Sequence, residues 1–404
     1  MEKTGAGSRR RNAVFAFLRP FARLITSMRC RLTLDKSAWD LKPPFIVVAN
    51  HVTDFDMLYI GLMFKESVRF VCSEDYVCGS PFAKLLKGTF NVIPFFKAGK
   101  GVRPTKEMLK ALKEGDSICL FPEGRHSPDG RTGPFKNSVA SLAKAAGCTV
   151  VTVRIDGYFV NPRWSHSNRR GPVRADVAGV YTAEQVASMT ADELLDVIRK
   201  DISVDAYAIH RGKKDYRGKD TAQRLEESYF ICPECGSWYT IGSHGDGFGC
   251  SCCGAEGTID ADGVISGGFR FDKLTDWWDW EWEELERRAD EAPDEVITDS
   301  GEVRMQELDA ASGSILPLGT VKLSATAREL RFGDEVREFS RLPMMSLRNG
   351  PTLLLEDGKH HYEFPLDGKC GDVYRMLSLI AHRGEWYRYE GEKDGRQEKE
   401  GSAG

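Results

Sequence analysis

The chain has 404 residues and a mass of 45.1 kDa, enough for two or three domains. Its formal charge of −4 is small, but positive charge gathers near the start and negative charge further along, as in residues 276–295. No segment approaches the roughly 20 uninterrupted apolar residues of a membrane-spanning helix. The sequence therefore argues against a bilayer-crossing protein and against a uniformly basic nucleic-acid binder.

Residues 1–34 are basic and amphipathic, with eight Lys or Arg and a single acidic residue, Glu2. Arg19 and Arg23 fall opposite an apolar stripe, and Pro20 predicts a break into two short helices. This pattern predicts a peripheral or monotopic segment on the cytoplasmic face of the cell membrane, attracted by anionic lipids. The alternative is a helix that merely covers the neighbouring domain. The stripe consists of Val14, Phe17, Leu18, Phe21, Leu24, Ile25 and Met28.

The first chemical motif follows a short apolar strand predicted at residues 45–49. His51 comes directly after this strand, and helical spacing begins near Asp54. Five residues on a regular helix turn side chains roughly 140° apart, so His51 and Asp56 converge only if His51 precedes the helix. A carboxylate on one imidazole nitrogen fixes the tautomer and leaves the other nitrogen to take a proton. The pair is a candidate general base with its orienting acid, although an isolated pair of this kind is more often a helix cap.

The second motif follows another apolar strand, predicted at residues 117–121. The strand leads into Phe121-Pro122-Glu123-Gly124 and then Arg125-His126-Ser127, a polar turn shaped by Pro and Gly. Two such turns, each after an apolar strand, favour acyl transfer over simple capping. No serine or cysteine stands in a motif that would activate it, which disfavours a covalent acyl-enzyme.

Asn50-His51, the spacing to Asp56, and the Phe-Pro-Glu-Gly run resemble the glycerolipid acyltransferase family over roughly residues 15–200. The resemblance implies that His51 is the base, that Asp56 orients it, and that a fatty acyl group moves from acyl-CoA or acyl carrier protein to 1-acylglycerol-3-phosphate, giving phosphatidate. It also implies a lysophospholipid-binding site, whose candidate residues are Gly88, Glu123, Gly124, Arg125, His126 and Lys136.

Three positions depart from the family pattern. Pro94 stands where the second block usually carries a phosphate-binding arginine, Arg125-His126-Ser127 replaces the usual Thr-Arg-Ser, and Thr152 replaces a proline. A different hydroxyl- or amine-bearing lipid acceptor therefore stays open as the alternative. Cations that could compensate are Lys97, Lys100, Arg103, Arg125 and Lys136.

Two Cys-x-x-Cys pairs, at residues 232–235 and 250–253, are separated by a Gly-rich stretch. This spacing predicts a zinc ribbon in which four thiolates hold a structural Zn²⁺ with no open coordination position. The predicted ligands are Cys232, Cys235, Cys250 and Cys253. Cys252 and, more weakly, His244 are alternative ligands, and disulfides are the alternative chemistry. The acidic flanks lack Lys/Arg runs interleaved with aromatic residues, so we expect no nucleic-acid partner.

The predicted fold class is α/β: an acyltransferase domain with helices around a mixed sheet, then a zinc ribbon, then a small β-rich domain with a C-terminal helix. Strands are expected near residues 321–323, 329–332, 336–339, 352–355 and 361–364, and a helix at 372–380. Their order resembles a pleckstrin-homology-like barrel and a group of bacterial acyltransferases with such extensions. A lipid-binding scaffold without activity is a further alternative. The expected parts are a membrane-surface segment (1–34), the acyltransferase domain (35–182), a helical connector (183–229), the ribbon (230–262), an acidic Trp-rich segment (263–301), the β domain (302–388) and a disordered tail (389–404).

Overall fold

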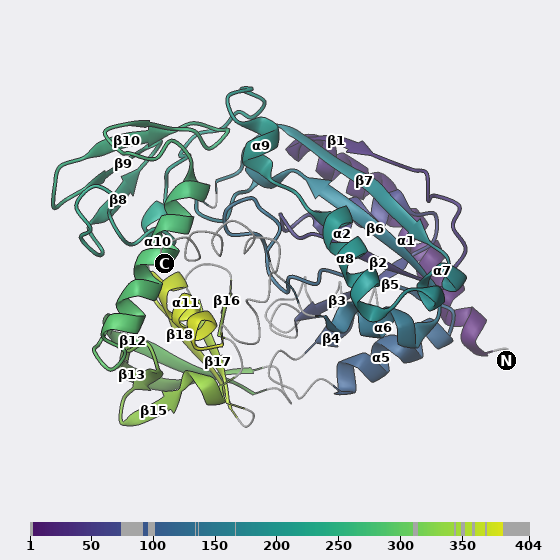
Figure 1. Ribbon diagram of the computed structural model, residues 1–404. Helices are drawn as coiled ribbons and strands as arrows, with labels where there is room; N and C mark the ends of the chain where they lie inside the picture. Colours follow the sequence, from purple (N-terminus) through teal and green to yellow (C-terminus); the bar gives the residue numbers. More distant parts are fainter. Residues whose placement is uncertain are drawn as a thin grey trace, which may run out of the picture.

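A computed structural model of the protein shows an α/β body, a small β-ribbon and a C-terminal β domain gathered around a long helix (Figure 1). Among the residues described, no helix is both long enough and apolar enough to cross a bilayer. The structure describes residues 3–73, 92–95, 102–133, 135, 137–165, 167–309, 314–342, 345–348, 352–357, 360–367 and 370–382.

The α/β body is built on a seven-stranded mixed sheet in the order β1-β7-β6-β2-β5-β3-β4. β7 is antiparallel to β6, whereas the other neighbouring pairs are parallel. β2 and β5 are buried at every position, as expected for central strands covered on both faces. The strands are β1 (Arg31–Leu34), β2 (Phe45–Ala49), β3 (Val68–Ser73), β4 (Ile93–Phe95), β5 (Ser117–Leu120), β6 (Thr149–Asp156) and β7 (Pro172–Tyr181).

Helices cover this sheet, and the mixed α/β architecture expected from the sequence is present (Figure 1). Leu194 and Ile198, in the predicted helical connector, are buried in the same core cluster as Ile46 and Val150. Residues beyond 182 therefore complete the α/β body. The helices are α1 (Lys3–Arg29), α2 (Asp56–Met63), α5 (Val102–Lys113), α6 (Ser138–Ala146), η1 (Tyr158–Val160), α7 (Ala183–Ser188), α8 (Ala191–Ile202), α9 (Ala206–His210) and η2 (Leu225–Glu227).

α1 is a single helix that contains Pro20, so the predicted break into two helices is wrong. Residues just before the proline hold the helix against the body. The Arg19 guanidinium donates to the carbonyl oxygens of Phe64 and Lys65 and stacks on the Trp39 ring at 4.4 Å. These tertiary contacts offset the donor that proline removes from the helix.

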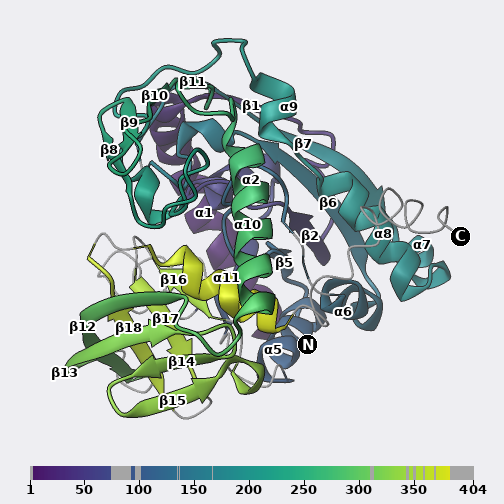
Figure 2. The same cartoon turned by 60° about the vertical axis from the view of Figure 1, so that its left-hand side comes forward.

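The ribbon is a four-stranded antiparallel sheet in the order β11-β10-β9-β8. It leads into α10 (Leu274–Glu291), which Figure 2 shows standing between the α/β body and the C-terminal domain. Trp277, Trp278 and Leu285 are buried on α10, so this acidic helix packs through its apolar side chains. The ribbon strands are β8 (Ile241–His244), β9 (Gly247–Cys250), β10 (Glu256–Ile259) and β11 (Ile265–Gly267).

The C-terminal domain is a seven-stranded antiparallel sheet in the order β15-β14-β13-β12-β18-β17-β16, followed by a buried helix. The expected strands and helix are present, but the long β12–β13 hairpin and β16 were not expected. β12 starts four residues before the predicted domain boundary at 302. The elements are β12 (Thr298–Asp309), β13 (Ser314–Ala325), β14 (Glu329–Phe332), β15 (Glu335–Glu338), η3 (Phe339–Arg341), β16 (Ser346–Arg348), β17 (Thr352–Glu356), β18 (His361–Pro365) and α11 (Asp372–Ala381).

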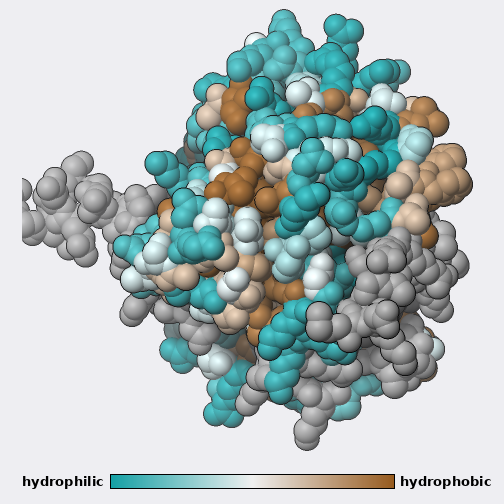
Figure 3. Space-filling model, turned by 90° about the vertical axis from the view of Figure 1, so that its right-hand side faces the viewer, coloured by the Kyte–Doolittle hydropathy of each residue, from teal (hydrophilic) through white to brown (hydrophobic). Residues whose placement is uncertain are grey.

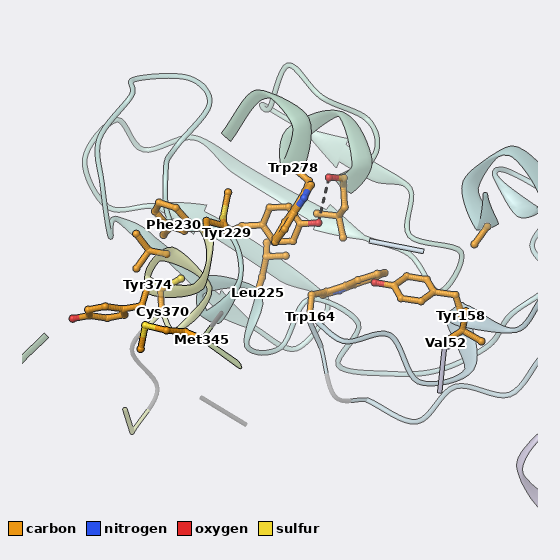
Figure 4. Close-up of a cluster of buried hydrophobic side chains, with 14 of the residues drawn as sticks. Val52, Tyr158, Trp164, Leu225, Tyr229, Phe230, Trp278, Met345, Cys370 and Tyr374 are labelled. Atoms are coloured by element: carbon orange, nitrogen blue, oxygen red, sulfur yellow. Dashed lines mark hydrogen bonds between the residues drawn. The ribbon is translucent and has the colours of Figure 1, made fainter. Parts of the chain in front are cut away.

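One hydrophobic cluster joins all three regions, so the extension is packed against the body. Figure 4 follows it from Val52, beside the first motif, through Tyr158 and Trp164 to Tyr229 and Trp278. Ring centroids lie 5.7 Å apart between Tyr158 and Trp164 and 5.9 Å apart between Tyr229 and Trp278. Aromatic pairs at this spacing contribute packing beyond simple area burial.

Candidate active site

The two predicted motifs meet at the carboxyl ends of neighbouring strands. β2 and β5 are parallel, with Val48 opposite Leu120, so the turns that follow them emerge at one edge of the sheet. Asn50, fully buried, fixes the first turn by exchanging two hydrogen bonds with the backbone of Ile155 on β6, at 2.8 and 2.7 Å. In the sequence, Asn50 stands out only as part of the motif, and no local pattern predicts its two hydrogen bonds to Ile155.

His51 precedes α2, as the argument from helix geometry required. Its Nδ1 lies 2.8 Å from Oδ2 of Asp56. A carboxylate only accepts, so Nδ1 carries the hydrogen and Nε2 is the nitrogen that can accept a proton. The His51 side chain is 21% exposed while Asp56 is fully buried, so the imidazole can be reached from solvent and its orienting acid cannot.

Asp56 is held by further donors. Its carboxylate accepts the backbone N–H groups of Val52 at 2.6 Å and Thr53 at 3.0 Å, and the Thr53 hydroxyl at 2.8 Å. Burial raises the pKa of Asp56 to about 6, while the nearby His126 and these donors oppose the rise. The donors favour the ionised carboxylate that an orienting partner needs.

The His51 ring is enclosed by two other rings. It stacks on Phe121 with centroids 4.2 Å apart, and His126 meets it edge-on at 4.0 Å. Burial and the neighbouring His51 charge lower the pKa of His126 to about 3. His126 is therefore a neutral neighbour of His51 at physiological pH.

Glu123 faces the backbone of both turns. Its Oε1 accepts the His51 N–H at 2.8 Å and its Oε2 accepts the Gly133 N–H at 2.6 Å. Burial raises the pKa of Glu123 to about 8, and the same two N–H groups oppose that rise. In this conformation the Glu123 carboxyl group joins the turns that follow β2 and β5, and its predicted contact with an acceptor stays a prediction. Gly124 adopts a left-handed φ of 67° and gives its N–H to the Phe121 carbonyl at 3.0 Å.

Two arginines stand near the histidines. Burial lowers the pKa of Arg125 to about 10, while Asp372 raises it and Arg163 lowers it. Arg163, which the sequence analysis missed, also lowers the pKa of His126. No motif marks Arg163, because it reaches the site from the segment after η1. Other predicted contributors cannot be placed: Gly88, Lys97, Lys100 and Lys136 lie outside the described residues, as does the side chain of Arg103.

The second predicted site is a cluster of four thiols on the ribbon. Sγ atoms of Cys232, Cys235, Cys250 and Cys253 all lie within 4.8 Å of one another. Two of the separations are 3.9 Å, between Cys232 and Cys253, and 3.7 Å, between Cys235 and Cys250. A disulfide needs about 2.05 Å, whereas four sulfurs at about 2.3 Å from a tetrahedral zinc lie about 3.8 Å apart. The spacing fits a metal better than disulfides.

Cys252, the fifth cysteine of this region, does not belong to the four-thiol group and has a different partner. Cys252 accepts a hydrogen bond from the Ser237 hydroxyl at 3.1 Å and is absent from the four-thiol group, as is His244. The choice between Cys252 and Cys253 that spacing alone left open therefore falls on Cys253.

Comparison with known proteins finds similarity over part of the α/β body. Residues 31–156 match the family model described as Acyltransferase. The chloroplastic 1-acyl-sn-glycerol-3-phosphate acyltransferases of Brassica napus and Arabidopsis thaliana are each 30% identical over 116 residues, which is 28% of this chain and 33% and 32% of theirs. The lyso-ornithine lipid O-acyltransferase of Brucella abortus is 30% identical over 106 residues, 26% of this chain and 38% of that protein.

The chain thus spans about a third of the length of the curated plant relatives. Among solved structures, the 1-acyl-sn-glycerophosphate acyltransferase of Thermotoga maritima has 22% identity and a TM-score of 0.43, covering 50% of this chain and 80% of that one. The family match contains His51, Asp56 and Glu123 and ends before the ribbon.

Proposed function

We propose that this acyltransferase-family domain moves a fatty acyl group from acyl-CoA or acyl carrier protein to 1-acylglycerol-3-phosphate, giving phosphatidate. The observation that carries the proposal is the 2.8 Å contact between His51 Nδ1 and the buried Asp56 carboxylate, inside the segment that matches the family. The choice of acceptor, and therefore of product, rests on the names of the two plant relatives, which are 1-acyl-sn-glycerol-3-phosphate acyltransferases.

The proposed chemistry is direct transfer. Nε2 of His51 takes the proton of the acceptor hydroxyl, that oxygen attacks the thioester carbonyl, and the carbon–sulfur bond breaks to release the carrier thiolate. Asp56 stabilises the imidazolium that forms. The Val52 and Thr53 N–H groups are used by Asp56 and the Gly124 N–H by Phe121. The oxyanion of the tetrahedral intermediate therefore needs other donors.

The acceptor phosphate is assigned to the space beside Arg125 and Arg163. Arg125 directly precedes His126 in the chain, and Arg163 lowers the pKa of both Arg125 and His126, which supports positive charge next to the base. An Arg can hold a phosphate with two parallel hydrogen bonds. This pair would compensate for Pro94, which stands where the family usually places arginine.

A second acceptor class has its own support. The Brucella relative, named as a lyso-ornithine lipid O-acyltransferase, is as similar over the matched segment as the plant enzymes. A different hydroxyl- or amine-bearing lipid is therefore the alternative acceptor.

We place the enzyme on the cytoplasmic face of the cell membrane through α1. Several of its apolar side chains remain exposed on the folded protein, including Phe17 and Met28, each 70% exposed. Figure 3 views the side of the molecule on the right in Figure 1, where apolar patches lie between polar residues. Phe21, Leu24 and Ile25 extend the exposed stripe, which suits insertion among lipid headgroups.

The extension is assigned structural roles. Four thiolates would hold one zinc ion that braces the ribbon and leaves no open coordination position. Seven antiparallel strands with a C-terminal helix support a pleckstrin-homology-like β domain. Its packing on α10 through α11 favours a role in stabilising the chain.

The proposal is tested by incubating the purified full chain with labelled acyl-CoA or acyl carrier protein and a panel of lysolipids in detergent micelles. We expect the highest kcat/KM with 1-acylglycerol-3-phosphate and a loss of at least about 100-fold in His51→Ala, because general-base catalysis contributes roughly 10²–10⁴-fold. His244→Ala, which removes an exposed histidine on the ribbon, is the matched control and should keep full activity. Full activity in His51→Ala would refute the assigned base, and a preference for an amine-bearing lysolipid would establish the alternative acceptor.

A further inference from the structure

An ion pair connects the extension to the loop that follows the second motif. The Arg131 guanidinium donates to both carboxylate oxygens of Asp279 on α10, at 2.8 and 2.6 Å. The same guanidinium donates from Nε to Asp129 at 2.7 Å. Arg131 lies inside the family-matched segment and Asp279 outside it. A bidentate pair of this kind fixes direction as well as distance.

The loop that carries Arg131 is bonded directly to the candidate base. Ser127 donates its N–H to the His51 carbonyl oxygen at 2.8 Å, and its hydroxyl donates to the Arg131 carbonyl oxygen at 2.6 Å. Two residues beyond Arg131, the Gly133 N–H reaches Glu123, whose other oxygen holds the His51 N–H. Arg131 is therefore connected to the His51 backbone in two ways, through its own carbonyl oxygen and Ser127, and through Gly133 and Glu123.

α10 is itself anchored on its other side. Glu281, fully buried, accepts the N–H groups of Phe230 and Ile231 at 2.6 and 2.7 Å, and the Trp277 indole donates to the Ile231 carbonyl oxygen at 3.0 Å. These residues directly precede Cys232, the first thiol of the cluster. Asp279 therefore lies on a helix that is hydrogen-bonded to residues 230–231 just before the ribbon, so its carboxylate can hold the loop in one position.

We propose that Asp279 is a positioning residue for acyl transfer: through Arg131 it orients the loop of residues 123–133 that sets the backbone of His51. The inference rests on the proposed function. Asp279 touches neither substrate nor the reacting atoms in this assignment, and it acts through Arg131. It gives the extension a part in catalysis that the family-matched segment alone does not contain.

The contact is suited to positioning more than to holding the fold together. Asp279 is 54% exposed and Arg131 32% exposed, and exposed ion pairs contribute little to stability. The loop is also tied to the segment after α8, because Thr132 donates to the Val204 carbonyl oxygen at 2.9 Å. Removing the Asp279 carboxylate should therefore leave a folded protein whose loop samples more orientations.

The experiment compares Asp279→Asn, Asp279→Glu and a control in the full chain. The control is Glu291→Gln, which breaks a surface pair with Arg287 on the same helix. We expect Asp279→Asn to lower kcat roughly tenfold, because small misplacements of catalytic groups cost rate steeply, with less effect on KM. Asp279→Glu should recover most of that loss, and Glu291→Gln should match the parent.

Amide hydrogen exchange over residues 123–133 gives a readout that needs no substrate. Faster exchange there in Asp279→Asn, with the thermal midpoint and the exchange of β2 unchanged, supports the proposal. Equal exchange and equal kcat in Asp279→Asn and Glu291→Gln overturn it. If the parent protein transfers no acyl group to any lysolipid, the proposed function fails, and the exchange comparison still decides whether Asp279 orders the loop.

Discussion

The candidate active site and the thiol cluster each bring polar side chains together, but the residues of the two sites are separated by very different lengths of chain. The active site joins two turns 72 residues apart, His51 and Glu123, across neighbouring parallel strands. The thiol cluster joins two short turns only 15 residues apart, between Cys235 and Cys250. Convergence over a long separation needs the whole sheet, whereas the cluster needs only one antiparallel hairpin. The active site should therefore respond to changes far along the chain, and the cluster mainly to changes in its own ligands.

The sharpest test of this contrast is Asp56→Asn. An asparagine can offer its amide to His51 in place of the carboxylate, so the required tautomer is lost and kcat should fall about 10³-fold or more. The content of thiol-bound metal should change little, because Asp56 contacts none of the four thiols. Steady-state kinetics and metal analysis on the same preparation measure both. An asparagine variant with near-parental kcat would mean that His51 does not depend on Asp56.

The reciprocal change is Cys253→Ser, with Cys252→Ser as its matched control. Loss of a thiolate ligand should remove about one zinc per chain and destabilise the ribbon by several kcal/mol, since metal binding supplies folding free energy to small sites. Cys252→Ser should keep the metal, because Cys252 lies outside the four-thiol group. Zinc content and thermal unfolding distinguish the two variants. Equal metal loss in both would contradict the choice of Cys253.

The smallest effect is expected from Glu123→Gln and concerns pH. The folded-state pKa of Glu123 is raised to about 8, above the ordinary value of 4.5, so the folded state holds its proton more tightly than the unfolded chain. The associated stability is fully present below about pH 4.5 and is lost as pH rises through about 8. Because Glu123 is only partly shielded from solvent, we expect roughly 1 kcal/mol. Thermal unfolding at pH 5 and pH 8 should show a smaller difference in Glu123→Gln than in the parent, and an identical difference in both would count against the raised pKa.

Much of the site could be predicted because its signals are local. The apolar run before His51 and the five-residue step to Asp56 together required a turn, and the 2.8 Å contact lies in that turn. The four thiols were predicted from spacing alone, and the α/β class was expected together with the family resemblance. Arg163, Asn50 and Asp279 were missed because each acts on a partner from a distant segment, and no local pattern marks such a contact.

Errors in the predicted elements have the same cause. Pro20 is a helix breaker by its own chemistry, yet α1 continues because Arg19 is held by the carbonyl oxygens of Phe64 and Lys65. Glu281 belongs to the acidic Trp-rich segment, where a charged side chain ordinarily stays in water, yet it is fully buried and two backbone N–H groups meet its carboxylate. In both cases a contact with a distant segment offsets a free-energy cost, that of proline inside a helix for Pro20 and that of burying a carboxylate for Glu281.

The sequence by itself determined which residue types could perform chemistry and where the chain turns, because strand periodicity and ligand spacing are short-range properties. Tertiary structure alone decided that Glu123 holds two backbone turns together, that Cys253 rather than Cys252 completes the thiol cluster, and that Asp279 of α10 contacts Arg131. These outcomes depend on which distant groups satisfy each buried donor and acceptor, and only the folded chain brings those groups within hydrogen-bonding distance.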